Sequence, residues 1–209
     1  MLCNSSEAPR QLIHTDFTAR PLSLRNFELD YAAYTASPDV IRRHSDGLWP
    51  VEGFTLAKDR ELVEKHEADH KAGRAFTFVL LDPNEEESLG CLYLNPLADY
   101  LDRVGAQPVI RESYGPASAM VTFWLRQDLE SADRARTVAE AVDGWIRDDW
   151  PLDAHVFRVL PTERCSVTGL QAAGFDLLAL SLPGQHSRYL WFSRTHTTHG
   201  KTEEPAPLP

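Results

Sequence analysis

The chain has 209 residues, of which 43% are hydrophobic and 25% are charged, a composition typical of a folded globular protein. It carries 21 Lys and Arg against 31 Asp and Glu, and the resulting net charge of −10 disfavours nucleic acid as a partner. Its length allows a full hydrophobic core, so the three widely spaced cysteines do not indicate a disulfide framework.

The sequence pattern also does not indicate a membrane span or a signal peptide. The longest apolar runs are too short to cross a membrane, and the first 20 residues lack the apolar stretch of a signal peptide. Together with reduced thiols, this predicts a cytoplasmic protein without a membrane contact. We expect residues 1–14 to be loose, residues 15–194 to form one domain, and residues 195–209, rich in Thr, Glu and Pro, to be a disordered tail.

The first elements alternate between strand and helix patterns. Residues 17–24 resemble a short strand, and Asn26 precedes a helix with Phe27, Tyr31 and Tyr34 on one face. Thr55 is a suitable N-cap for a long, highly charged helix that ends near residue 73.

A hairpin follows. Residues 75–81 and 89–94 are apolar runs on either side of the turn cluster at 82–84. Residues 95–118, which contain several Gly and Pro, are expected to form an irregular insertion, and residues 119–125 another buried strand.

The second half begins with the clearest helix. Ser131 is its predicted N-cap, Pro151 stops it, and its core-facing stripe comprises Val138, Val142, Trp145 and Ile146. Strand 155–160 and helix 161–173 follow, and Gly174 suits the position after that helix. Residues 177–182 and 188–193 are predicted to form a final hairpin around residues 183–184.

This order predicts an α+β protein. Neighbouring strands in the hairpins are antiparallel, whereas the passage from 119 to 160 is a strand–helix–strand unit that should cross over right-handedly to a parallel neighbour. A mixed, mostly antiparallel sheet of six to seven strands with helices on both faces follows.

Two local features add a family resemblance. Trp124 and Leu125 end a strand just before a helix, and Ser166 precedes Gly174-Phe175 by eight residues. With the element order from 17 to 193, this resembles the GNAT superfamily of N-acetyltransferases, in particular the branch that acetylates ribosomal proteins and small amines. The resemblance implies a GNAT-like sheet that is splayed at its centre, between the strands near 125 and 155.

The same resemblance implies acetyl-CoA as co-substrate. Its pantetheine arm would lie in the gap beside Phe123, Trp124 and Leu125, and its pyrophosphate at the start of the next helix. The chain departs from the family there, because residues 130–137 contain no glycine. Arg134 and Arg136 stand near the positions of the family's glycines, with Thr137 beside them, and side-chain contacts to phosphate would replace amide contacts. Further departures are Glu163 for an Asn and Leu170 for a Tyr.

Acyl transfer also needs a proton acceptor and a donor to the leaving sulfur. We assign Ser166 as the donor and Glu112, in the 95–118 insertion near Tyr114, as the base. We expect Trp49, Tyr93 and the insertion to line the acceptor pocket. Each of these also fits an ordinary role: a surface serine, a loop residue, two core aromatics.

These observations predict an acyl-CoA-dependent N-acetyltransferase for a primary amine, either a small molecule or a protein N-terminus. The alternative is a non-catalytic GNAT-like binding module that has lost acetyl-CoA binding and forms a homodimer through its last strands. A remote alternative is a zinc hydrolase, because His66-Glu67-x-x-His70 matches a zinc motif. Its charged surroundings and the lack of an evident third ligand favour a solvated helix, so no metal site is assigned.

Overall fold

A computed structural model describes residues 1–194, so the predicted tail lies outside the described residues. The strands are β1 (Leu12–Ile13), β2 (Thr18–Pro21), β3 (Phe76–Leu81), β4 (Ser88–Pro96), β5 (Ser118–Leu125), β6 (Ala154–Val159), β7 (Asp176–Leu177) and β8 (Leu190–Ser193). The helices are α1 (Phe27–Thr35), α2 (Pro38–His44), α3 (Leu56–Lys71), α4 (Leu97–Arg103), α5 (Pro108–Glu112), α6 (Ala132–Asp149) and α7 (Arg164–Ala172). None of these helices is long and apolar enough to cross a membrane.

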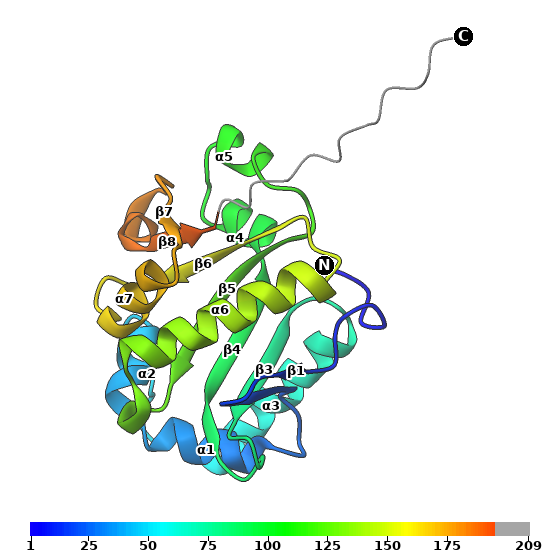
Figure 1. The fold of residues 1–209 in the computed structure, drawn as a ribbon, viewed down its shortest axis with the longest axis vertical. Helices are drawn as coiled ribbons and strands as arrows, with labels where there is room; N and C mark the ends of the chain where they lie inside the picture. Colours follow the sequence, from blue (N-terminus) through cyan, green and yellow to red (C-terminus); the bar gives the residue numbers. More distant parts are fainter. Residues whose placement is uncertain (195–209) are drawn as a thin grey trace.

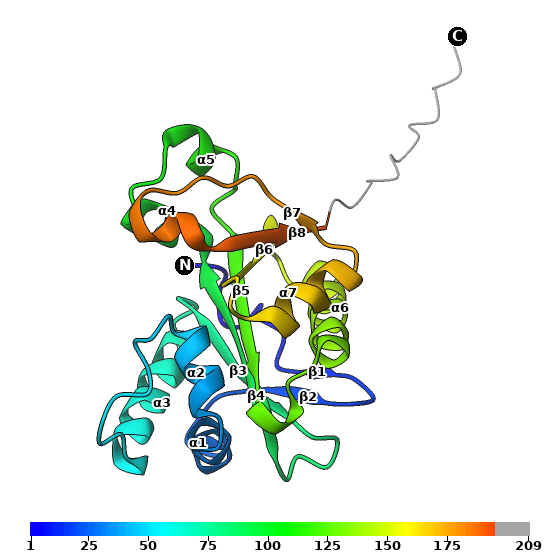
Figure 2. The same cartoon turned by 90° about the vertical axis from the view of Figure 1, so that its left-hand side faces the viewer.

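The strands form one sheet in the order β1-β2-β3-β4-β5-β6-β8-β7, and β5–β6 is its parallel pair. Helices α1, α2 and α3 lie on one side of the sheet and α6 and α7 on the other (Figures 1 and 2). This confirms the predicted mixed α+β class, although the sheet has eight strands rather than six or seven.

The sheet is splayed at its centre. β5 pairs with β6 from Ser118–Ala154 to Val121–Phe157, and the ladder stops there although β5 continues to Leu125. On its other edge, β5 stays paired with β4 up to the Gly90–Leu125 pair. β6 is paired on its own outer edge with β8. The last four residues of β5 therefore have a backbone edge without a strand partner on the β6 side.

The two faces of β5 belong to different cores. Phe123 and Leu125 pack in the cluster beneath α6, whereas Trp124 packs in the cluster beneath α1, α2 and α3. Successive side chains of a strand point to opposite faces, so the end of β5 is a wall shared by both sides of the sheet.

Several local predictions are confirmed. The Thr55 hydroxyl accepts a hydrogen bond from the Lys58 amide, and the Ser131 hydroxyl accepts one from the Arg134 amide. Gly174 has φ +80°, the left-handed conformation that favours glycine after a helix. β3 and β4 form the predicted hairpin.

Three segments differ from expectation. The 95–118 insertion contains α4 and α5, because Leu97, Tyr100 and Leu101 bury one helix face against β5 and β8. The predicted final hairpin is reduced to β7 and β8, with a 3-10 helix at Gly184–Arg188 between them. Residues 1–14 were expected to be loose, but Leu2, Ala8 and Leu12 are buried in the core beneath α6.

Candidate functional site

The gap between the diverging strands is filled by side chains. The N-termini of α6 and α7 meet there beside Trp124 and Leu125, and α2 covers them from the other face of the sheet. The space left between these elements is only about 10 Å³. Ser166 lines it and is buried, so the structure places this predicted residue at the gap.

Two side-chain pairs close the gap. Arg43 on α2 lies 2.5 Å from Glu130, which precedes α6. His44 lies 2.7 Å from Glu163, whose other oxygen accepts a hydrogen bond from the Leu160 amide. Burial acts to raise the pKa of Glu163, but His44 and the hydrogen bonds outweigh it and hold the pKa below its ordinary value.

The start of α6 lies directly against α7. A Cβ added to Gly169 would lie 2.7 Å from both the Ala135 Cβ and the Arg136 amide nitrogen, so only glycine permits this approach. Arg134 and Arg136 are exposed, and neither forms an ion pair within 4 Å with a described residue. The Thr137 hydroxyl donates to the Asp133 carbonyl. The three residues predicted to contact phosphate therefore lie close together on the first two turns of α6.

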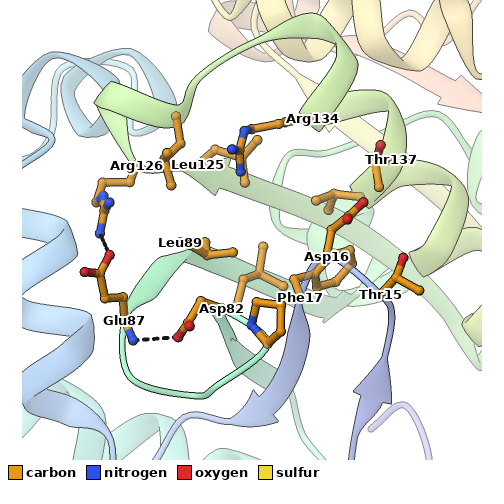
Figure 3. Close-up of a pocket in the computed structure, with 14 residues that line it drawn as sticks. Thr15, Asp16, Phe17, Asp82, Glu87, Leu89, Leu125, Arg126, Arg134 and Thr137 are labelled. Atoms are coloured by element: carbon orange, nitrogen blue, oxygen red, sulfur yellow. Dashed lines mark hydrogen bonds and ion pairs between the residues drawn. The ribbon is translucent and has the colours of Figure 1, made fainter.

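A cavity of about 560 Å³ lies on the α6 face, between the start of α6 and the β3–β4 loop. Figure 3 shows Arg134 and Thr137 on its helix side, with Asp82 and Glu87 on its loop side. Arg126 is held by Glu87 and Asp128. We call this the hairpin cavity. Leu125 lines both this cavity and the gap.

A second cavity of about 250 Å³ lies on the opposite face, enclosed by α1, α2, α3 and β4. Its aromatic walls are Tyr34, Trp49, Phe54, Tyr93 and Trp124. Two carboxylates, Asp30 and Asp59, also line it, and we call it the acidic cavity. Trp124 lines both this cavity and the gap.

The two carboxylates are buried with little compensation. Asp30 Oδ1, Asp59 Oδ2 and the Tyr34 hydroxyl have no hydrogen-bond partner among the described residues. Burial, together with the nearby Asp59, raises the pKa of Asp30 to about 7, and burial raises the pKa of Asp59 to about 6. Buried groups with such shifts cluster at functional sites.

Of the predicted acceptor-pocket residues, Trp49 and Tyr93 do line one cavity. The insertion does not reach it, which corrects the assignment of Glu112. Glu112 is exposed on α5 and lines a separate surface cavity, while Tyr114 lines another cavity together with Asp153 and His155. The reason is topological: the insertion joins the start of β5, whereas the sheet opens at the end of that strand, roughly 20 Å away.

Asp30 and Asp59 were not found from the sequence, although a signal exists. Asp30 lies three residues after Phe27 and four before Tyr34, and Asp59 lies at the same spacings between Leu56 and Val63. Each carboxylate therefore interrupts the apolar stripe of its helix.

The side chains of the zinc motif contact neighbouring residues of the fold. His66 hydrogen bonds to Thr77, Glu67 pairs with Lys71, and the His70 ring packs against Phe76 and Phe78. Within residues 1–194 no three His, Cys, Asp or Glu side chains are grouped so as to hold a metal ion. Among the described residues, the two histidines of the zinc motif therefore have no third ligand beside them.

No protein-family model matches the sequence, and no curated protein matches it significantly. Solved structures do resemble the fold. RimL, a ribosomal α-N-protein acetyltransferase in complex with coenzyme A, aligns with a TM-score of 0.61 and 15% identity over 87% of this chain and 96% of that one. Ribosomal-protein-S5-alanine acetyltransferase from Vibrio fischeri gives 0.61 and 15%, covering 87% and 94%. A GNAT-family acetyltransferase from Bacillus anthracis gives 0.59 and 13%, covering 87% and 95%. At these identities the likeness establishes the GNAT fold.

Proposed function

We propose that this protein is an acyl-CoA-dependent N-acetyltransferase that acts on a primary amine. One observation carries the proposal: β5 continues beyond its parallel neighbour, and its end joins the two faces of the sheet. Trp124 faces the acidic cavity and Leu125 the hairpin cavity, and both line the gap between them. A thioester in the gap would therefore meet an amine in the acidic cavity.

The residues around the gap have the chemistry to hold acyl-CoA. The free backbone edge of Phe123, Trp124 and Leu125 offers hydrogen bonds to the amides of a pantetheine arm. The N-terminus of α6, with Arg134 and Arg136, favours a pyrophosphate. The Arg43–Glu130 pair must open for this, because the gap is closed by that contact.

Acyl-CoA would supply the acyl group as a thioester. In the transfer, the ammonium gives one proton to a base and the free amine attacks the carbonyl carbon. A C–N bond forms and the C–S bond breaks, the nitrogen releases its second proton, and the departing sulfur takes up one proton, so that a neutral amide and a thiol result. Ser166 is our proposed donor to that sulfur, since it lines the gap and is buried.

The wider assignments are proposals as well. The structural neighbours include acetyltransferases of ribosomal proteins, which supports an amine or peptide acceptor. We propose a cytoplasmic protein, because all three cysteines are free thiols. We propose neither nucleic acid nor a membrane as a partner.

Calorimetric titration with acetyl-CoA tests the function. We expect saturable binding, and we expect Arg134→Glu with Arg136→Glu to weaken it about tenfold or more, because two attractive charges become repulsive. Arg111→Glu on α5 is the matched control and should bind normally. Absence of binding at millimolar acetyl-CoA contradicts the proposal, and unchanged affinity in the double variant removes the arginines from the site.

A second candidate is the non-catalytic module, which is favoured by the closed gap of about 10 Å³. It predicts no acetyl-CoA binding by the wild type and none by Arg43→Ala, in which the closing pair is removed.

A further inference from the structure

The acidic cavity has an imbalance of charge. Two buried carboxylates line it, and no Lys or Arg lines it. Its two histidines do not compensate: His44 is paired with Glu163, and burial lowers the pKa of His66, which hydrogen bonds to Thr77. A buried carboxylate without a cation is costly, so this cavity is built at the expense of stability.

Asp30 also lies at the end of a row of neighbouring polar side chains that begins at Trp124. The Trp124 indole N–H donates to the Tyr93 hydroxyl over 3.1 Å. Cys91 lies beside both Tyr93 and Asp30, and burial together with the nearby Asp30 carboxylate raises the pKa of Cys91 and of Tyr93. Cys91 and Trp124 are direct partners across the β4–β5 ladder. Asp30 is thereby close, through Cys91 and the half-buried Tyr93, to the strand that borders the gap.

We propose that Asp30 and Asp59 form an ammonium-binding subsite and that the acceptor is a small organic amine with an apolar body, held as a cation between these carboxylates and the aromatic walls of the acidic cavity. As a binding site this stands by itself. That the bound amine is the acyl acceptor rests on the function proposed above.

The lining favours an amine over other cations. With two carboxylates and one hydroxyl, Ca²⁺ or Mg²⁺ would need several waters to complete its six or more ligands, and the aromatic walls offer those waters no hydrogen-bond partners. Aromatic faces attract an organic cation, and Trp49, Phe54 and Tyr93 supply them.

The lining also favours a small amine over a peptide N-terminus. A peptide would carry its backbone amides and carbonyls into the cavity, and the polar lining atoms without partners are those of Asp30, Tyr34 and Asp59. Buried backbone groups would then remain without hydrogen bonds, which disfavours a peptide. The volume of about 250 Å³ suits a molecule the size of a single amino acid.

The subsite also provides the proton acceptor that the transfer needs. The bound ammonium gives one N–H proton to the Asp30 carboxylate, which becomes a neutral acid, and the nitrogen becomes a free amine. The raised pKa of Asp30, about 7, suits this exchange near neutral pH.

Calorimetry without any acyl-CoA tests the subsite. The probes are phenethylamine, its neutral isostere 2-phenylethanol, and the peptide Ala-Ala-Ala. We expect phenethylamine to bind at least about tenfold more tightly than the other two. Asp30→Asn and Asp59→Asn should each weaken phenethylamine binding about tenfold or more, since each removes one negative charge. Glu28→Gln and Glu61→Gln, the same change at exposed positions of α1 and α3, should leave it unchanged.

The outcomes separate this inference from the proposed function. Equal binding of amine and alcohol, no binding of phenethylamine, tighter binding of the peptide, or unchanged affinity in both Asp variants overturns the subsite, even where acetyl-CoA binds normally. Selective amine binding without acetyl-CoA binding supports the subsite and contradicts the transferase. Circular dichroism and thermal melting of each variant confirm that the binding losses are not losses of folding.

Discussion

Glu163 in the gap and Asp30 in the acidic cavity are both carboxylates with only 7% of their surface exposed. Their pKa values are nevertheless shifted in opposite directions. The pKa of Glu163 lies below its ordinary value, whereas that of Asp30 is raised to about 7. Glu163 accepts hydrogen bonds from the Leu160 amide and His44; Asp30 faces a second carboxylate and keeps one oxygen without a partner. Because the two carboxylates are equally buried, their different partners account for the opposite directions of their pKa shifts.

The difference separates a completed region from an incomplete one. In the gap each carboxylate has a side-chain partner from another part of the fold: Glu130 pairs with Arg43, and Glu163 with His44. In the acidic cavity the charges lack counterparts within residues 1–194. The first arrangement stabilises the folded chain, and the second is stabilised once a cation arrives.

The largest expected effect lies in the completed region. Glu163→Ala leaves His44 and the Leu160 amide without their acceptor in a buried place, and we expect the free energy of unfolding to fall by about 3 kcal/mol. Urea denaturation at pH 7 measures it. The loss should shrink below pH 4.5, the ordinary pKa of a glutamate, because the lowered pKa of Glu163 contributes stability that disappears as its carboxylate is protonated.

Two results would contradict this view of the gap. A Glu163→Ala protein as stable as the wild type would show that the pair with His44 contributes nothing. A loss that grows on acidification would show that the Glu163 pKa is raised rather than lowered. Glu112→Ala, at an exposed position of α5, is the control and should change little.

In the acidic cavity, removing a carboxylate should increase the stability of the protein instead of lowering it. Asp30→Asn removes a buried charge without a counterion, and we expect the free energy of unfolding at pH 8 to rise by roughly 2 kcal/mol. Because the folded pKa of about 7 exceeds the ordinary 3.8, the folded wild type holds a proton that the unfolded chain releases. The free energy of unfolding of the wild type therefore falls as pH rises from about 4 to 7. In Asp30→Asn, the part of this decrease that comes from Asp30 should be absent.

Denaturation of the wild type and Asp30→Asn at pH 4, 6 and 8 measures this slope. The groups that face Asp30 are Asp59 on α3, Tyr34 on α1, and Cys91 and Tyr93 on β4. Asp59 keeps its own raised pKa, so a smaller slope remains in the variant. Destabilisation by Asp30→Asn at pH 8 would show that a cationic partner is already present in the fold.

The sequence predicted those parts of the fold that depend on local patterns. The two helix caps and the β3–β4 hairpin follow from side-chain chemistry within a few residues. The splayed sheet was implied by the family resemblance rather than by a pattern of residues in this chain. The insertion was predicted wrongly because its Gly and Pro residues mask the short apolar pattern of α4, which is stabilised by packing against β5 and β8.

The candidate site was less predictable because it is assembled from distant segments. Trp49 and Tyr93 were expected to share a pocket, as they do. Asp30 and Asp59 come from two helices whose packing no local pattern reports. Glu112 was assigned as base because the insertion was expected to overhang the pocket, which its attachment at the opposite end of β5 prevents.

The smallest effect on stability should come from the other pair of the gap. Arg43 and Glu130 are 34% and 22% exposed at the side chain, and a pair of this kind contributes about 0.5 kcal/mol. Arg43→Ala should cost that much in denaturation, yet raise the affinity for acetyl-CoA about threefold, since binding no longer has to break the pair. Arg42→Ala, its exposed neighbour on α2, should change neither value. Weaker acetyl-CoA binding in Arg43→Ala would instead show that Arg43 is a ligand contact, and then the closed gap is not an obstacle that the co-substrate displaces.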